Sequence, residues 1–237
     1  TAQFFYFNAA TYLLVIFALL NVHIPSFLPD PTQGWRRFTA GLSIARDRPV
    51  VRRLIISLAT FSLLSLPYVG LFPAVAKLTF NIDEIGATYK WLYATWGLGA
   101  CLGGLAVGTV FSHIDMRRLI QWGFAGFSVA MFLFALSQSP LPAFISGFFL
   151  GFAYFFTTTS MMTVVQMRLE PEVRGRVLAL WFMAFGGLIP FGNMFFGPLI
   201  DRYGSRSMLM ISSATALFLA WRCDITALDK EQAEIKA

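Results

Sequence analysis

The side chains best suited to chemistry in this sequence are hydroxyls and aromatic rings embedded in apolar stretches. The densest group runs from Tyr154 through Thr157 and Thr158 to Ser160. Rings stack and hydroxyls hydrogen-bond, so this group suits the binding of a small molecule rather than the breaking of a bond. Thr and Ser hydroxyls can also bond back to their own helix, and then no site is implied. Both interpretations stay open for this stretch.

Asn193 is another polar residue inside an apolar stretch, three residues after Pro190. It could contact a small molecule, although an interhelical hydrogen bond is the commoner role of Asn in a membrane. Pro190 lacks a backbone N–H and should kink or loosen its helix. We therefore expect an irregular helix here, with Asn193 as a candidate binding residue.

Patterns typical of enzymes and metal sites are missing from the sequence. There is no GxxxxGK[ST] phosphate loop and no acidic pair within the apolar stretches. Cys101 and Cys223 are far apart, and His23 and His113 stand alone, so no ligand cluster is expected. We expect no catalytic residue, no metal and no cofactor. No Asp, Glu or Arg lies near the middle of an apolar stretch, which removes the best candidate for a proton relay in this chain.

The elements that position these residues are apolar segments about as long as a bilayer is thick. An α-helix of about 20 apolar residues crosses the hydrocarbon core. Apolar residues make up 57% of the chain and charged residues 13%, whereas soluble domains have about a quarter charged residues. Strands are excluded because the segments are solidly apolar and do not alternate. The sequence predicts an all-α, polytopic transmembrane bundle with spans at about Phe4–Val22, Leu54–Phe80, Ala87–Phe111, Leu119–Leu136, Ala143–Val165, Val177–Ile200 and Met208–Trp221.

The orientation follows from the positive charges. Of the 18 Lys and Arg residues, all but Lys77, Lys90, Arg202 and Arg206 lie in loops on one side of the predicted spans. Loops rich in Lys and Arg stay in the cytoplasm. We therefore expect a multi-pass protein of the plasma membrane, surrounded by lipid, with a cytoplasmic C-terminus. The net charge of +6 reflects this bias, so no nucleic-acid partner is expected.

The longest break between spans has a pattern of its own. Trp35, Phe38, Leu42 and Ala45 recur at helical spacing, with arginines on other faces. This pattern predicts an amphipathic helix on the inner leaflet. A site for a signalling partner is the weaker alternative.

The third span carries two pairs of glycines four residues apart, Gly99 with Gly103 and Gly104 with Gly108. Four-residue spacing places small residues on one helix face, where a neighbouring backbone can approach closely. We expect either static packing or a sliding contact, and Leu at Gly103 or at Gly104 should be harmful.

Three stretches resemble the C-terminal half of a major facilitator superfamily transporter, and in particular the drug and siderophore exporters called transmembrane secretion effectors. Leu64–Tyr68 with Phe72 and Pro73 is similar to the Pro-rich seventh helix, and Tyr93–Gly108 to the eighth. The third stretch is similar to the turn before helix eleven and to that helix's outer end; it comprises Pro171–Val177, Pro190–Gly192 and Gly197–Gly204. The last segment matches the loop pattern G-x-x-x-D-R-x-G, which the family usually carries on the cytoplasmic side.

The resemblance implies a domain organisation. Residues 1–23 would correspond to helix six, 24–53 to the cytoplasmic linker between the two halves, and 54–221 to helices seven to twelve. Residues 222–237 would form a cytoplasmic tail. Helices one to five would then precede this chain and complete the transporter.

The resemblance also implies a function and a site. It implies proton-driven export of lipophilic or amphipathic small molecules by alternating access. The alternatives are an importer of nutrients or metabolites, a seven-helix receptor, and a membrane scaffold that transports nothing. Helices seven and ten line the central cavity in this family. This places the candidate substrate-binding residues on two spans, Ser62, Ser65 and Tyr68 on one and Tyr154, Thr157 and Thr158 on the other, with Asn193 in addition.

Overall fold

The computed structural model describes residues 2–21 and 35–223, and the side chains of 6–21 and 41–223. The chain divides into two units, residues 1–34 and 35–237. The first unit contains α1 (Ala2–Asn21), whose described side chains are exposed except for Thr11. The expected spans are confirmed as mainly helical within the described residues. The predicted break from 24 to 34 and the tail from 224 to 237 lie outside them.

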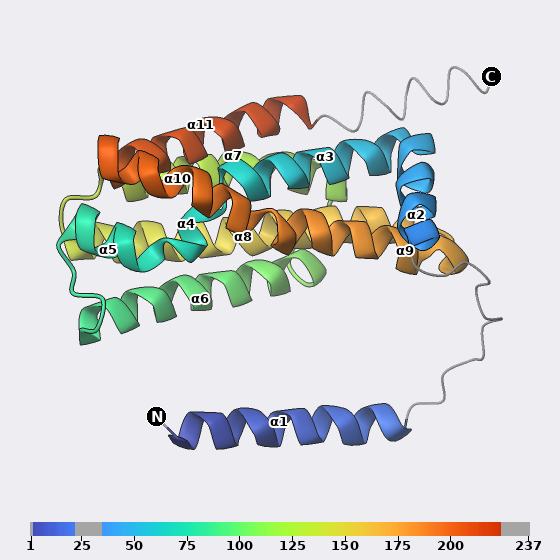
Figure 1. Ribbon diagram of the computed structural model, residues 1–237, viewed down its shortest axis with the longest axis horizontal. Helices are drawn as coiled ribbons and strands as arrows, with labels where there is room; N and C mark the ends of the chain where they lie inside the picture. Colours follow the sequence, from blue (N-terminus) through green and yellow to red (C-terminus); the bar gives the residue numbers. More distant parts are fainter. Residues whose placement is uncertain (1, 22–34, 224–237) are drawn as a thin grey trace. The chain divides into compact units, whose positions relative to one another are not determined.

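The second unit is a helical bundle (Figure 1), and its described residues contain no strand. Each expected span is matched by one helix or by consecutive helices. Trp35–Asp47 forms α2, the predicted amphipathic helix. The others are α3 (Pro49–Leu64), α4 (Pro67–Gly70), α5 (Phe72–Phe80), α6 (Ala87–Gly108), α7 (Met116–Leu136), α8 (Pro140–Met167), α9 (Pro171–Phe182), the π-helix η1 (Met183–Gly187), α10 (Ile189–Tyr203) and α11 (Ser205–Arg222).

Prolines divide two of the expected spans. Pro67 and Pro73 each begin a new short helix, so the second span is three pieces, α3, α4 and α5. The sixth span runs through α9, η1 and α10, and its π-helix ends three residues before Pro190. A proline has no N–H for the helical ladder, so the turn before it adopts another hydrogen-bond pattern. The expected irregularity near Pro190 is therefore confirmed.

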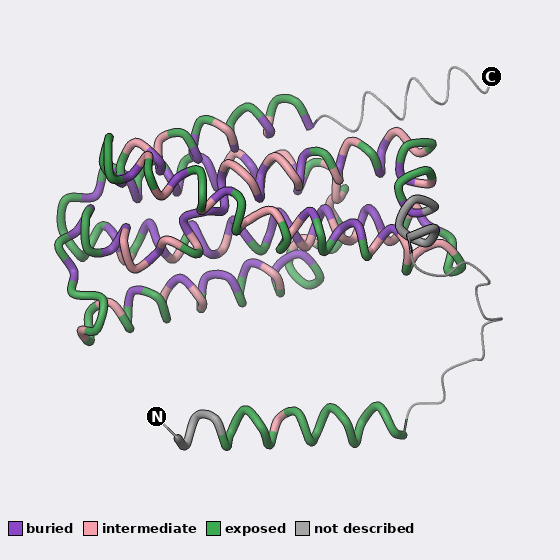
Figure 2. Tube along the Cα trace, viewed as in Figure 1, coloured by how far each residue is buried: buried purple, intermediate pink, exposed green. Residues whose placement is uncertain are grey.

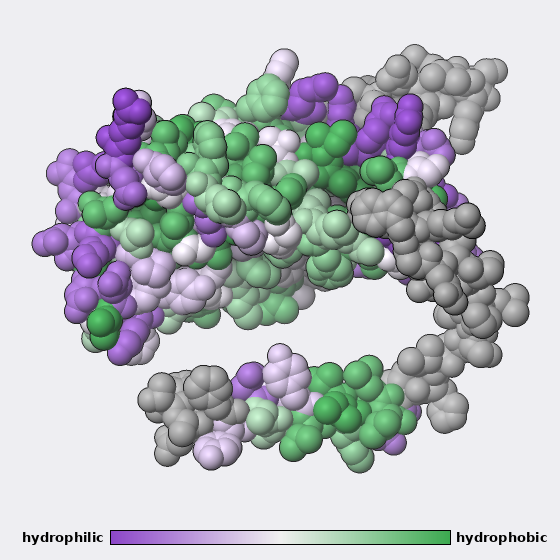
Figure 3. Space-filling model, viewed as in Figure 1, coloured by the Kyte–Doolittle hydropathy of each residue, from purple (hydrophilic) through white to green (hydrophobic). Residues whose placement is uncertain are grey.

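Three stretches of the described residues are each long and apolar enough to cross a membrane: Met116–Leu136, Pro140–Met167 and Pro171–Tyr203. The other expected spans are helical but shorter, broken or less apolar. On the face shown in Figure 3, hydrophobic side chains cover the middle of the bundle and hydrophilic ones gather at its ends. This distribution is the one that a bilayer would solvate.

Helix α8 is central to the bundle and is among its most buried helices (Figure 2). It packs against α6 and α7, and α7 packs against α11. At α6, a Cβ added to Gly99 or to Gly103 would collide with the backbone of α8 at Phe148 or Phe152. The prediction of close packing is confirmed for this glycine pair.

The prediction of close packing is wrong for the second glycine pair, Gly104 and Gly108. A Cβ at Gly104 would have only Thr159 Oγ1 near it, at 3.7 Å, and one at Gly108 would meet nothing within 4 Å. The reason is geometric, since adjacent positions on a helix are about 100° apart. Only one of the two stripes can therefore face α8.

Candidate functional site

Five aromatic rings form a near-parallel series across the centre of the bundle. The series begins with Tyr89, Tyr93 and Trp96 of α6, passes to Tyr154 of α8 and ends at Phe185 of η1. Successive ring centroids lie 6.2, 5.3, 6.0 and 6.1 Å apart, with interplanar angles of 24°, 29°, 25° and 22°. Offset stacking at these separations is favourable. We call these five residues the aromatic ladder.

The sequence of α6 explains three of the five ladder rings. Tyr89, Tyr93 and Trp96 are four and three residues apart, so their side chains lie on one helix face. The glycine contact then brings Tyr154 of α8 against Trp96. A Cβ at Gly151 of α8 would collide with the carbonyl oxygen of Trp96. The small residues at this interface therefore set the spacing of the rings.

Tyr68 is hydrogen-bonded to the ladder through Trp96. The indole Nε1–H of Trp96 donates a hydrogen bond to Tyr68 Oη at 3.1 Å. Tyr68 is fully buried, and its ring contacts Phe72 and Phe127. Trp96 thus joins the two tyrosines predicted from the sequence, Tyr68 and Tyr154, although it was not itself predicted.

One ring of the ladder and one ring beside it are exposed, whereas the rings at the middle of the ladder are buried. Tyr93 is 41% exposed, and Phe155, whose ring lies edge-on to Tyr154 at 4.8 Å, is 37% exposed. Trp96, Tyr154 and Tyr68 are buried. A ligand can therefore reach Tyr93 and Phe155 in this conformation, whereas contact with Tyr68 requires the helices to move.

Three predicted hydroxyls have partners within the protein. Ser65 Oγ donates to the carbonyl of Ser212 on α11 at 3.0 Å. Thr157 and Thr158 each bond to a carbonyl one turn earlier in α8, at 2.6 and 3.1 Å. The structure places Ser65 at the contact with α11, and it gives the two threonines the back-bonded arrangement.

Two predicted residues carry buried oxygens without a hydrogen-bond partner among the described residues. They are Ser62 Oγ of α3 and Asn193 Oδ1 of α10. The side chain of Asn193 lies directly against Gly70 of α4, where an added Cβ would collide with it. Buried polar groups in native proteins are nearly always paired, so an unpaired oxygen is a position where water or a ligand can bind.

The sequence of this chain matches a known family. A family model described as a transmembrane secretion effector matches residues 1–236. The chain belongs to this family. It is therefore a membrane transporter of the major facilitator superfamily, and not an enzyme. No curated protein matches the chain.

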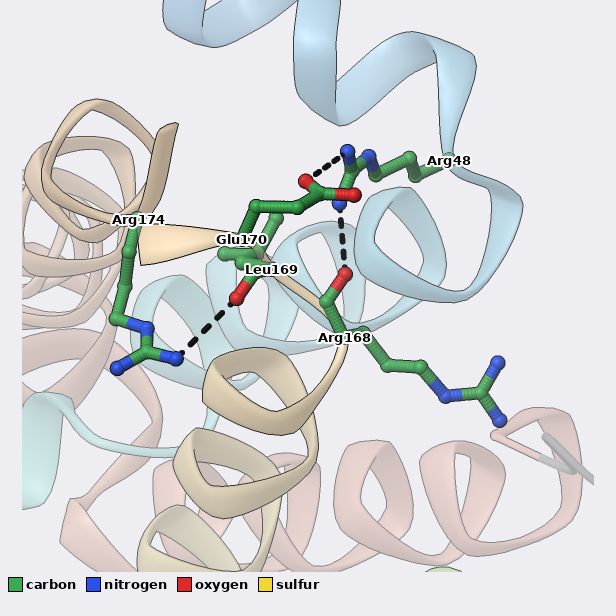
Figure 4. A network of polar contacts seen from close by, with 5 residues as sticks. All are labelled: Arg48, Arg168, Leu169, Glu170 and Arg174. Carbon is green, nitrogen blue, oxygen red and sulfur yellow. Dashed lines mark hydrogen bonds and ion pairs between the residues drawn. The ribbon is translucent and has the colours of Figure 1, made fainter. Parts of the chain in front are cut away.

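The Arg-rich end of this transporter is held by a polar network, shown in Figure 4. Arg48, which precedes α3, forms an ion pair with Glu170 and donates to the carbonyl of Arg168 at 2.7 Å. Arg174 of α9 donates to the carbonyl of Leu169 at 3.2 Å. The hydrogen bond from Arg48 lowers the pKa of the exposed Glu170 carboxyl. The network ties the start of α3 to the turn between α8 and α9.

The buried rings of the candidate site, Trp96, Tyr154 and Tyr68, contact other aromatic rings. Phe61, Phe72, Phe127 and Phe185 supply these contacts, whereas Glu84 lies near Tyr89 at the start of α6. No group of three or more His, Cys, Asp or Glu residues that could hold a metal occurs in the described part of the chain. The arrangement can stack on rings and hydrogen-bond to a few polar atoms, which is chemistry for recognition.

Proposed function

We propose that this chain is the C-terminal half of a secondary transporter that exports small lipophilic or amphipathic molecules by alternating access. In this proposal α1 corresponds to helix six, and α3 to α11 correspond to helices seven to twelve. The Arg-rich ends face the cytoplasm of a plasma membrane, and helices one to five belong to the same transporter. Superfamily transporters bind substrate near the midplane, between two halves that rock against each other.

The aromatic ladder is the observation that carries the proposal. It offers stacked rings from two different helices and a π-helix, and the rings of Tyr89, Tyr93 and Tyr154 carry hydroxyl groups. Binding sites for drug-sized molecules are mostly apolar, with a few polar groups that fix orientation. Tyr93 and Phe155 are the exposed rings of this surface, so they make the first contact with substrate. Ser62 and Asn193 supply the unpaired oxygens.

Proton coupling requires a side chain that binds and releases a proton. The described spans have no acidic side chain near their middle, so the group that binds the proton belongs to helices one to five. The present half then contributes substrate contacts and the rocking surface. This division predicts that variants of the ladder alter substrate affinity and leave the response to the proton gradient intact.

The test uses the full-length protein in inside-out vesicles and a fluorescent, planar, lipophilic dye. An imposed inward-acidic gradient should drive dye into the vesicles, and an uncoupler should abolish uptake. Tyr93→Ala and Phe155→Ala should raise the KM for the dye at normal expression. Trp91→Ala is the matched control, because Trp91 is an exposed ring of α6 outside the ladder.

Three results would count against the proposal. Uptake that ignores the proton gradient would contradict the coupling. Dye movement only in right-side-out vesicles would indicate import. An equal KM change in Trp91→Ala and Tyr93→Ala would remove the ladder as the binding surface.

A further inference from the structure

A groove between α3 and α11 combines cationic side chains with exposed apolar ones. Its volume is about 290 Å³, and its lining includes Arg52 and Arg53 of α3 and Arg222 of α11. Among the described residues that line it there is no Asp or Glu. Ile56 and Phe218 continue the lining and are 58% and 52% exposed. The groove therefore attracts negative charge and also leaves apolar surface open.

The two kinds of side chain occupy different depths. Helix α3 begins at Pro49 and α11 ends at Arg222, and these two helix ends lie at the same end of the bundle (Figure 1). Ile56 is one turn along α3 from Arg52, and Phe218 is one turn before Arg222, so the apolar residues lie about 6 Å deeper. In a membrane, the arginines then lie at headgroup level and the apolar residues face the hydrocarbon.

The arginines have hydrogen-bond donors to offer. Arg52 Nη1 donates to the carbonyl of Arg46 at 3.3 Å, but a guanidinium has five N–H donors. Arg222 is exposed at the end of its helix. A guanidinium binds phosphate oxygens in a bidentate manner, and basic pockets between transmembrane helices on the cytoplasmic side bind anionic headgroups.

We propose that this groove binds one anionic phospholipid of the cytoplasmic leaflet. The phosphate lies between Arg52 and Arg222, and an acyl chain follows Ile56 and Phe218. A soluble anion would gain nothing from the exposed apolar residues, and a zwitterionic lipid brings no net negative charge to the arginines. The site is separate from the aromatic ladder, and it ties the start of α3 and the end of α11 to the membrane.

The test measures lipid binding to the purified full-length protein by native mass spectrometry in detergent. Phosphatidylglycerol is titrated against phosphatidylcholine with the same acyl chains, and inorganic phosphate is added as a competitor. The Arg52→Gln/Arg222→Gln variant is compared with Arg46→Gln/Arg118→Gln. The second pair removes equal charge at the same end of the bundle but lies outside the groove lining.

We expect phosphatidylglycerol to bind with a stoichiometry near one, and phosphatidylcholine to bind weakly. Arg52→Gln/Arg222→Gln should weaken phosphatidylglycerol roughly thirty-fold, since each basic residue near anionic lipid is worth about 1 kcal/mol. The control pair should change binding little. Phe218→Ser should weaken phosphatidylglycerol without creating affinity for phosphate.

Each other outcome would overturn the proposal. Equal weakening in both double variants would mean a diffuse surface charge. Displacement of the lipid by millimolar phosphate would mean a site for soluble anions. The sequence after Arg222 contains four acidic residues, Asp224, Asp229, Glu231 and Glu234, which could compete with the lipid for the arginines. Lipid binding is therefore also measured with a chain that ends at Cys223. Lipid binding that appears only in this shortened chain would mean that the tail occupies the groove in the intact protein.

Discussion

Replacing Gly103 by Ala should destabilise the bundle, because the added methyl group meets backbone and not a movable side chain. Its Cβ would lie 2.8 Å from the carbonyl carbon and 2.9 Å from the Cα of Phe152 in α8. Carbon atoms in contact prefer about 3.5–4.0 Å. Helices α6 and α8 would therefore have to separate by roughly 1 Å along this contact.

The magnitude follows from two opposing terms. Overpacking a close contact costs about 1–3 kcal/mol, and the change from Gly to Ala in a helix returns up to about 1 kcal/mol. The free energy of unfolding should therefore fall by up to about 2 kcal/mol. Gly97→Ala is the control, because a Cβ there meets nothing within 4 Å. Gly104→Ala is a second control, with its nearest neighbour at 3.7 Å.

The assay is reversible unfolding of the full-length protein in mixed micelles, titrated with dodecyl sulfate and followed by circular dichroism. Gly97→Ala and Gly104→Ala should match or exceed the parent, and Gly103→Ala should unfold earlier. Tryptophan emission of the folded state should also change in Gly103→Ala, because Trp96 and Tyr154 lie on the two helices that the added methyl group separates. If Gly103→Ala unfolds like Gly97→Ala, the two helices do not meet through this face and the reasoning fails.

Three further predictions concern the hydrogen bond under the ladder, the ion pair at the Arg-rich end and the topology. Tyr68→Phe leaves the buried Trp96 N–H without a partner and should lower the free energy of unfolding by about 1–3 kcal/mol. The double variant Tyr68→Phe/Trp96→Phe should lose less stability than the sum of the two single variants. Additive losses would contradict the hydrogen bond. The pKa of Glu170 is lowered in the folded protein, so its ion pair stabilises the fold above the unfolded pKa of about 4.5, and this stabilisation is lost as the pH falls through the folded pKa. A thermal-shift series over this pH range should show the loss in the parent and in Arg118→Gln. Arg48→Gln should not show it. In a Cys101→Ser background, cysteines at Ser139 or Asp83 should react with an impermeant thiol reagent from outside intact cells and one at Glu172 should not, and labelling of Glu172 would reverse the orientation.

The helices themselves could be predicted from hydropathy, but some of their ends could not. The predicted span from Leu119 to Leu136 became Met116–Leu136, a difference of three residues. The predicted start at Leu54 was five residues late, because α3 begins at Pro49 and includes Arg52 and Arg53. Hydropathy reports which residues prefer hydrocarbon, whereas a helix continues into the interface, where long arginine side chains reach water.

The choice between the two glycine stripes was beyond the sequence. Gly99 with Gly103 and Gly104 with Gly108 have the same spacing and similar neighbours. What separates them is which face of α6 meets α8, and that is fixed by the packing of the whole bundle. Gly151 of α8 contains a signal of the same kind, but a small residue in one helix does not identify its partner in another.

The candidate site shows the same division between local and tertiary information. The spacing of Tyr89, Tyr93 and Trp96 was available in the sequence and would have indicated an aromatic face on α6. That Tyr154 and Phe185 extend it depends on contacts among three elements. A helical hydroxyl was ambiguous for a physical reason: it can bond to its own helix or point to a ligand without any change in sequence pattern.

The structure separates the predicted polar residues by what their oxygens already do. Three of the hydroxyls already donate hydrogen bonds to carbonyls of the protein; they belong to Thr157, Thr158 and Ser65. A ligand that bonds to one of them would have to replace this existing partner. Ser62 and Asn193 have buried oxygens still unpaired, so a ligand that donates a hydrogen bond gains there without such a loss. A ligand can also stack on an exposed ring without replacing a hydrogen-bond partner, and the rings of Tyr93 and Phe155 are exposed. In the site that we propose, recognition depends mainly on ring stacking, and the proposal therefore expects uncharged, flat and amphipathic molecules to bind better than strongly hydrated ions.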